Sequence, residues 1–390
     1  MKHTIYALTM FALAACTSPQ EEAIDRHALV TRNNPEVTAM DSLSSLSVGN
    51  GEFAYTVDAT GLQTFPEVYK NGVPLGTQSQ WGWHSFGNPE NYKPEEALVE
   101  YDFSHGHKEL YATQPKEPGR AKEASDWYRV NPHRLHLGII GLELENEVRP
   151  SDVQNIQQSL DMWNGIINSR FTLKETPYHI QTVCHPERDM IAARLSARQP
   201  PGIKFHFPYP TGGHCDDACN WEANDKHSTT LVSEDAQSAV LKRTLDATTY
   251  YVTISWEGAA KLREKSANYF VLTPTDSVFT FTCQFTPQAS AAPILTFAEV
   301  QQASSGHWQN YWTQGAVADF SQCTDVRAKE LERRVVLSQY LLAIQCAGST
   351  PPQETGLTYN SWFGKFHLEM IWWHQAQFAL WGHPELLDRT

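Results

Sequence analysis

Apolar and polar side chains alternate along much of the chain between about residue 25 and residue 290. The stretch 202–210 has an apolar side chain at every second position, with Lys204 and His206 between them, and 278–285 repeats the pattern. A period of two predicts half-buried strands. Their apolar faces are Ile203, Phe205, Phe207 and Tyr209 in the first stretch, and Phe279, Phe281, Cys283 and Phe285 in the second. Because glycine and proline turns separate such runs with no βαβ rhythm, we expect a large antiparallel β-sandwich over residues 26–292.

The spacing of apolar residues changes after Pro293. Residues 295–315 predict a linker helix with Trp308 and Trp312 on one face, within a linker region spanning 293–322. Thr324-Asp325 is a capping signal for a long amphipathic helix that ends near Gly348. We expect charged side chains on its outer face and an apolar stripe that includes Val326, Leu331, Val335 and Leu342.

The last part of the chain, after a proline-rich loop, predicts one more helix. Its apolar side chains fall on two sides: Ile371, His374, Phe378 and Trp381 on one, and Phe366, Met370, Trp373 and Leu380 on the other. A helix that is apolar around much of its circumference is expected to be surrounded by protein. Residues 323–390 would then begin a helical domain.

The segment "PPQETGLTYNSWFGKFHLEMIWWH", preceded by "ELERRVVLSQYLLAIQCAGS", resembles the start of the catalytic toroid of the six-hairpin glycosidases, in the style of glycoside hydrolase families 65 and 95. The resemblance in motif covers about residues 296–385. It implies a β + α multidomain chain with an N-terminal antiparallel β-supersandwich, a linker helix and the first helices of an incomplete (α/α)6 toroid. In these families the general acid lies on a later hairpin. We therefore expect a C-terminally truncated chain, inactive alone, with the catalytic acid and base beyond Thr390.

The resemblance also marks candidate substrate-binding residues. The fucosidase-like family carries Asn-x-Asn where this chain has Lys365 and His367, and Glu369 aligns with a glutamate, so no particular sugar is indicated. Three ionisable groups near a buried helix start cost several kcal/mol unless they are paired or act on a ligand. Trp362 is a candidate sugar platform, whereas Trp373 and His374 fit either the site or the core. The candidate set is Trp362, Lys365, His367, Glu369, Trp373 and His374.

Composition and charge restrict the partners. The 390 residues are 41% hydrophobic and 11% aromatic, enough for one or two large domains. The formal net charge of −14, without clusters of lysine and arginine, argues against nucleic acid as a partner. An oligo- or polysaccharide is the expected substrate, and no metal or organic cofactor is indicated.

The N-terminus predicts export. The apolar run "IYALTMFALAA" is too short to span a membrane and is typical of a signal peptide. Leu13-Ala14-Ala15-Cys16 resembles a lipobox, so residues 1–15 would be removed, a lipid on Cys16 would be the only membrane attachment, and 16–25 would be an acidic tether like those of Bacteroidota lipoproteins. We expect an outer-membrane lipoprotein at the cell surface or facing the periplasm. The alternative is an ordinary secretory signal with an incidental cysteine.

The remaining cysteines are Cys184, Cys215, Cys219, Cys283, Cys323 and Cys346, most of them expected as buried thiols. Those in "HCDDACNW" lie beside His214, Asp216 and Asp217, with His227 further on, a poor match to zinc-ligand spacing. A polar loop, closed by a local disulfide, is the preferred interpretation.

Two functions are compatible with these features. The first is an exo-acting, inverting glycoside hydrolase, and the second is a non-catalytic glycan-binding surface lipoprotein. Were the chain complete, Glu369, His367, or the loop carboxylates Asp216 and Asp217 would have to carry the chemistry.

Overall fold

The computed structural model describes residues 23–390. The predicted signal peptide, the lipidated Cys16 and most of the tether lie outside the described residues. Within 23–390 no helix is both long and apolar enough to cross a bilayer.

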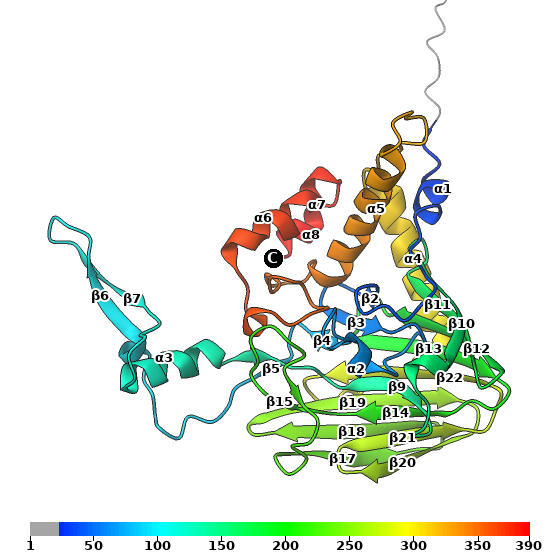
Figure 1. Cartoon of the computed structure of the whole chain (residues 1–390), viewed down its shortest axis with the longest axis horizontal. Helices are drawn as coiled ribbons and strands as arrows, with labels where there is room; N and C mark the ends of the chain where they lie inside the picture. Colours follow the sequence, from blue (N-terminus) through cyan, green and yellow to red (C-terminus); the bar gives the residue numbers. More distant parts are fainter. Residues whose placement is uncertain (1–22) are drawn as a thin grey trace, which may run out of the picture.

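The larger of two main sheets has nine strands in the order β1-β10-β11-β12-β13-β22-β19-β18-β17 (Figure 1). All its pairings are antiparallel. The bounds are β1 (Glu36–Val37), β10 (Val153–Asp161), β11 (Ile166–Leu173), β12 (Thr176–Cys184), β13 (Met190–Ala197), β22 (Val278–Thr286), β19 (Thr248–Glu257), β18 (Ser238–Leu245) and β17 (His227–Glu234).

Two smaller sheets and three strand pairs complete the β structure. The four-stranded sheet consists of β20 (Ala260–Ser266), β21 (Tyr269–Pro274), β14 (Gly202–His206) and β9 (Ile139–Glu143). The three-stranded sheet consists of β2 (Leu46–Gly49), β3 (Phe53–Val57) and β4 (Thr77–Ser79). The pairs are β5 (Trp83–His84) with β8 (His133–Arg134), β6 (Leu98–Asp102) with β7 (Lys108–Ala112), and β15 (Tyr209–Pro210) with β16 (Cys219–Asn220).

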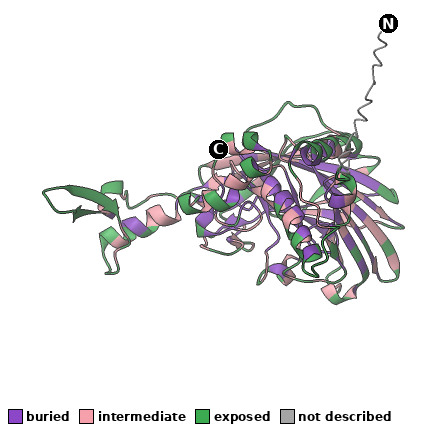
Figure 2. Ribbon diagram, turned by 90° about the horizontal axis from the view of Figure 1, so that it is seen from above, coloured by how far each residue is buried: buried purple, intermediate pink, exposed green. Residues whose placement is uncertain are grey.

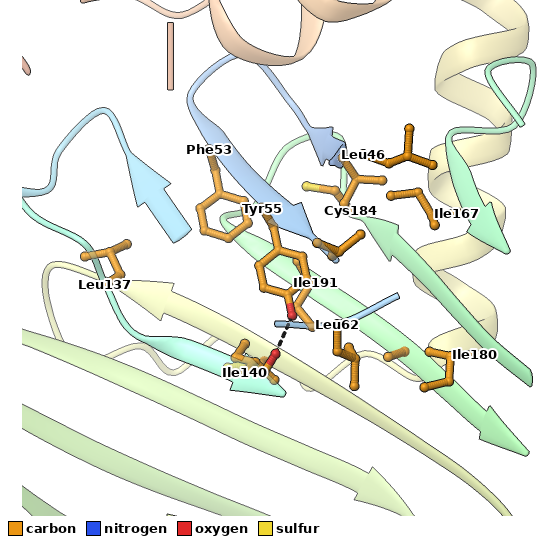
Figure 3. Close-up of a cluster of buried hydrophobic side chains, with 14 of the residues drawn as sticks. Leu46, Phe53, Tyr55, Leu62, Leu137, Ile140, Ile167, Ile180, Cys184 and Ile191 are labelled. Atoms are coloured by element: carbon orange, nitrogen blue, oxygen red, sulfur yellow. Dashed lines mark hydrogen bonds between the residues drawn. The ribbon is translucent and has the colours of Figure 1, made fainter. Parts of the chain in front are cut away.

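The core lies between the large sheet and the two smaller ones. Phe205 of β14 packs edge-on against Phe281 of β22, with ring centroids 6.2 Å apart, and Phe53 of β3 stacks on Phe285 at 5.8 Å. In this core the Tyr55 hydroxyl donates to the Ile140 carbonyl at 2.7 Å (Figure 3). The strand predicted at 278–285 is confirmed, and the apolar faces expected in both stretches are buried. The stretch 202–210 is divided, because β14 ends at His206 and Tyr209–Pro210 belongs to the separate pair of β15 with β16.

Several helices interrupt the region expected to hold only strands. They are α1 (Arg26–Thr31), α2 (Pro66–Tyr69), α3 (Arg120–Val130) and the 3-10 turns η1 (Pro94–Ala97) and η2 (Pro150–Asp152). The β6–β7 hairpin and α3 project from the sandwich as an arm, whose hairpin is exposed along its length (Figures 1 and 2). The alternation rule misses this arm because its strands have no buried face.

The helix predicted over residues 295–315 is confirmed as α4 (Phe297–Gln314). Thr296 and Glu299 form a capping box at its start, which satisfies the free amides of the first turn. Trp308 and Trp312 are both buried, and their ring centroids lie 6.5 Å apart. The helix lies against β12 and β13.

The long helix α5 (Ala328–Gln345) is also confirmed, but its buried face differs from the predicted stripe. Val326 precedes the helix and is 94% exposed, and Leu331 is 53% exposed. The buried side chains are Ala328, Glu332, Val336, Gln339, Tyr340, Ala343 and Ile344. Glu332 can be buried because Arg32 donates two hydrogen bonds to its carboxylate, at 2.9 and 2.8 Å.

The single terminal helix predicted from the sequence is wrong. The segment contains the 3-10 turns η3 (Trp362–Gly364) and η4 (Leu368–Met370) and the short helices α6 (Ile371–His374), α7 (Ala376–Leu380) and α8 (Pro384–Asp388). Gln375, with φ −123°, separates α6 from α7. The expectation that protein surrounds the helix also fails, since Trp372, Trp373 and Leu380 are 66–79% exposed.

Candidate functional site

Two loops that are distant in sequence meet beside β8. The Phe363 amide donates to the His214 carbonyl at 3.2 Å, and the Tyr359 hydroxyl donates to the Cys215 carbonyl at 3.0 Å. The Asn360 side-chain amide donates to the Gly213 carbonyl at 3.2 Å. The polar loop of "HCDDACNW" and the tryptophan-bearing loop of "YNSWFGKFH" therefore form one patch.

A buried glutamine organises the second loop. Gln353 is fully buried, and its Nε2 donates to the Tyr359 carbonyl and to Oε1 of Gln78, each at 2.8 Å, and also to the Gly356 carbonyl. Gln353 further forms a β-bridge with Phe366. These contacts fix both ends of the segment that presents Trp362.

The backbone at Trp362 and Phe363 is strained. Both residues have a positive φ, 49° and 63°, in a region that non-glycine residues rarely adopt. Such conformations cost on the order of 1–3 kcal/mol each and cluster at functional sites. The surroundings enforce the strain, because Phe363 is buried and a Cβ at Gly364 would come within 2.2 Å of the Arg134 Cβ.

The strained turn holds the Trp362 ring at the surface, where it is 37% exposed and lies next to two imidazole rings and a guanidinium group. His214 meets the ring edge-on at 4.4 Å, and His367 lies 5.2 Å away. The Arg129 guanidinium lies 5.8 Å from the ring centroid. An aromatic face with neighbouring imidazole and guanidinium donors can stack on an apolar ring face and bind hydroxyl groups at its rim.

Lys365 is directed away from this patch. Its Nζ donates to the carbonyls of Tyr128, Arg129 and Asn131 at 3.1, 2.7 and 3.2 Å, at the C-terminal end of α3. An ammonium there satisfies carbonyls that lack intrahelical partners and complements the helix dipole. Burial, and then the neighbouring Arg129 charge, lower the pKa of Lys365. With its three hydrogens engaged, Lys365 is accounted for without a ligand.

The other predicted residues are dispersed. Glu369 lies exposed in η4, and Trp373 is 66% exposed on α6. His374 is buried, and its Nε2 lies 2.8 Å from the Glu354 carbonyl, so it ties α6 to the proline-rich loop. Burial lowers the pKa of His374. Of the six candidates, only Trp362 and His367 are brought into ring contact.

Sequence reasoning missed the buried polar residues beneath the patch. Nδ1 of His84 lies 3.0 Å from Nε2 of His133, and Nε2 of His84 lies 2.9 Å from the Asp246 carboxylate. Burial lowers the pKa of His133 to about 4. Burial also lowers the pKa of Arg134 to about 9, and Arg134 donates to the Ser79 carbonyl at 2.8 Å. These side chains and Arg129 come from unrelated strands and from the arm, so sequence spacing offers no signal for them.

The polar loop was considered above for a local disulfide and for a metal site. Cys215 and Cys219 are free thiols, so the expected local disulfide is absent. Within residues 23–390 no group of three or more His, Cys, Asp or Glu side chains is arranged to hold a metal ion. Asp216 instead accepts a hydrogen bond from the Ala218 amide at 2.8 Å.

No protein-family model and no curated protein sequence matches the chain. Solved structures with a related arrangement include glycoside hydrolases and a phosphorylase. A protein described as a kojibiose phosphorylase, from the human microbiome, is 10% identical with a TM-score of 0.47, over 82% of this chain and 42% of that one. A bacterial glucoamylase complexed with acarbose is 10% identical with a TM-score of 0.41, over 62% of this chain and 41% of that one.

A family GH92 α-mannosidase from Bacteroides thetaiotaomicron is 9% identical with a TM-score of 0.31, over 81% of this chain and 41% of that one. The chain thus spans about two fifths of the length of these structures.

Proposed function

We propose that the chain is the glycan-recognising part of an exo-acting, inverting glycoside hydrolase. The observation that carries the proposal is Trp362, whose ring is held at the surface by a strained backbone between His214 and His367. Strain of this kind persists only where the surroundings enforce it, and it commonly serves presentation of a side chain.

A saccharide is the ligand that suits this patch. The face of an indole ring stacks on the C–H face of a sugar, while imidazole and guanidinium groups bind its hydroxyls. The net charge of −14 disfavours polyanionic ligands as a class.

Hydrolysis with inversion needs two carboxyl groups about 6.5–9.5 Å apart on opposite sides of the scissile bond. The ring contacts of Trp362 are with imidazoles and a guanidinium, none of which is a carboxyl group. The patch therefore supplies binding, and we assign the acid and the base to carboxylates outside it. Attachment through a lipid on Cys16, at the cell surface or facing the periplasm, is part of the same proposal.

Affinity electrophoresis in gels that contain a neutral polysaccharide, such as an α-glucan, an α-mannan or a xylan, tests whether the patch binds glycans. We expect Trp362→Ala to abolish the retardation shown by the wild-type chain. Trp372→Ala is the matched control, since Trp372 is 70% exposed but lies in α6, outside the patch. Equal retardation of the wild type and Trp362→Ala would reject the proposed site.

A non-catalytic glycan-binding lipoprotein is the second candidate function. It is favoured by Lys365, whose ammonium group binds backbone carbonyls at the end of α3. Of the three ionisable groups expected to bind substrate, this leaves His367 and Glu369. Release of reducing sugar, followed by proton NMR of the first-formed anomer, separates the two functions. Glycan binding without hydrolysis by the native full-length protein would favour the second.

A further inference from the structure

A separate cavity of about 250 Å³ opens on the sandwich, on the other side of the polar loop. It is lined by Pro66, Glu67, Lys70, Ile139, Lys204, His206, Asp217 and Trp221. These residues come from α2 and the residue after it, from β9 and β14, and from the segment 211–226. The cavity therefore lies on the four-stranded sheet and away from α4 to α8. Asp217 and Trp221 belong to the same polar loop as His214, but none of the lining residues is among the groups that contact the Trp362 ring, which are His214, His367 and Arg129.

The indole of Trp221 is held by two imidazoles. His206 lies 4.9 Å from it, and His136 meets it edge-on at 5.6 Å with an interplanar angle of 82°. His206 is itself packed against Tyr269 at 4.7 Å. Burial, and then the charges of Lys204 and Arg243, lower the pKa of His206 to about 4, so the ring is neutral at pH 7. The cavity therefore has an aromatic wall of fixed orientation.

The remaining lining provides both donors and acceptors with balanced charge. Glu67 and Asp217 are carboxylates, and Lys70 and Lys204 are ammonium groups, so their formal charges cancel. Lys204 donates to the Thr64 carbonyl at 2.8 Å, which fixes its position at the cavity. A charged ligand would leave one of these charges uncompensated, whereas a neutral polyol can donate to the carboxylates and accept from the ammonium groups.

We propose that this cavity binds one neutral sugar residue, with its apolar face against Trp221 and its hydroxyls bonded to Asp217 and Lys204. The small volume suits a single ring. The inference does not depend on the proposed hydrolase activity, because it requires neither the Trp362 patch nor any bond cleavage. It adds a second carbohydrate site, located in the sandwich.

Saturation-transfer NMR on the full chain tests the proposal with D-glucose, D-galactose, D-mannose and L-fucose, and with D-glucuronate and D-glucosamine as charged counterparts. We expect at least one neutral sugar to bind, and to bind more tightly than its charged counterparts. Asp217→Asn should weaken that binding at least 5-fold, and Trp221→Ala should abolish it. Glu222→Gln is the matched control, since Glu222 is exposed beside Trp221 but does not line the cavity.

Circular dichroism and a thermal melt check that each variant is folded, and Asp217→Asn keeps the test valid if Trp221→Ala does not fold. Binding lost in Trp221→Ala but retained in Trp362→Ala supports the cavity. Binding lost only in Trp362→Ala overturns it while leaving the proposed function intact. Three other outcomes would also overturn the proposed cavity site. They are a preference for a charged sugar, no binding of any neutral sugar, and equal binding by the wild type and Asp217→Asn.

Discussion

The ammonium of Lys365 closes the C-terminal end of α3 through three backbone carbonyls. Lys365→Met keeps the length of the side chain and removes these bonds. We expect it to lower the free energy of unfolding by about 1–3 kcal/mol, because charge-assisted hydrogen bonds at a helix end are lost. Urea unfolding measures the change. Lys365→Arg is the control and should recover part of the loss, and an unchanged stability in Lys365→Met would contradict the capping role.

Three imidazoles, two buried and one half-buried, give the protein an acid-sensitive stability. Burial lowers the pKa of His133, His206 and His227 to about 4. Below the unfolded value near 6.5 the unfolded chain binds more protons than the folded one, so stability falls as the pH drops from 6.5 toward 4. Asp189 has the opposite effect, because burial raises its pKa to about 6. Its contribution to the free energy of unfolding is full below about pH 4 and is lost as the pH rises from about 4 to 6.

Burial also raises the pKa of the Asp58 carboxyl group, and it also lowers the pKa of His84 and His374. The imidazoles outnumber the two carboxyl groups, so we expect the urea midpoint to decrease between pH 6.5 and pH 4. His133→Gln should reduce that decrease, and Asp189→Asn should make it steeper. A midpoint that increases over this range would show that the carboxyl group dominates.

At the scale of elements, the arm formed by the β6–β7 hairpin and α3 projects from the sandwich. Its hairpin exposes Val99, Tyr101, Phe103, Leu110 and Tyr111, each 45–61% accessible. The Thr113 amide donates to the Ala97 carbonyl at 3.1 Å, so residues 98–112 can be replaced by a two-residue Asn-Gly turn.

We expect this deletion to change the melting temperature by less than about 3 °C, since the hairpin buries little surface against the body. Binding of the apolar dye ANS should decrease. Leu110→Ser is the control, which keeps the hairpin and removes one exposed apolar group. A drop of about 10 °C or more would show that the arm is part of the cooperative fold.

The elements that could be predicted from the sequence are those with one buried face. Alternation located the strands around Phe205 and Phe281, and Trp308 with Trp312 located α4. The terminal segment failed because its apolar residues do not share one buried face, and Gln375 breaks the helix. Of the residues that form the candidate patch, the sequence indicated Trp362 and His367 as substrate-binding, whereas Arg129 and His214 reach Trp362 only through tertiary contacts.

At the scale of the whole molecule, the terminal segment is docked through a few side chains. Phe378 is fully buried, and His383 stacks on Tyr311 with ring centroids 4.1 Å apart. Around these anchors, large apolar side chains are more than half exposed: Phe366, Leu368, Trp372, Trp373 and Leu380. An exposed apolar surface of this kind marks an interface or a risk of aggregation.

Limited proteolysis tests the strength of this docking. We expect Phe378→Ala to accelerate cleavage within 366–390, because truncating a buried phenylalanine costs about 3–5 kcal/mol. The sandwich and the long helices α4 and α5 should remain resistant, because their buried side chains belong to one core cluster. Leu380→Ala is the control, since that side chain is 79% exposed. Equal cleavage rates in the two variants would show that Phe378 does not anchor the segment.

The bidentate pair of Arg32 with Glu332 connects the end of the first described helix to α5, across 300 positions of the sequence. The apolar core is likewise continuous, since Tyr340 and Ile344 of α5 belong to the same cluster as Phe53 of β3. Unfolding of α5 would therefore expose the sandwich core and deprive Arg32 and the buried Asn33 of the carboxylate that accepts their hydrogen bonds. Calorimetry should record a single endotherm for the sandwich and the long helices, with a calorimetric enthalpy equal to the van't Hoff enthalpy. Two separated endotherms would mean that the helices melt independently. We therefore expect the strand and helix regions to behave as one thermodynamic unit, even though their sequences follow different periodicities.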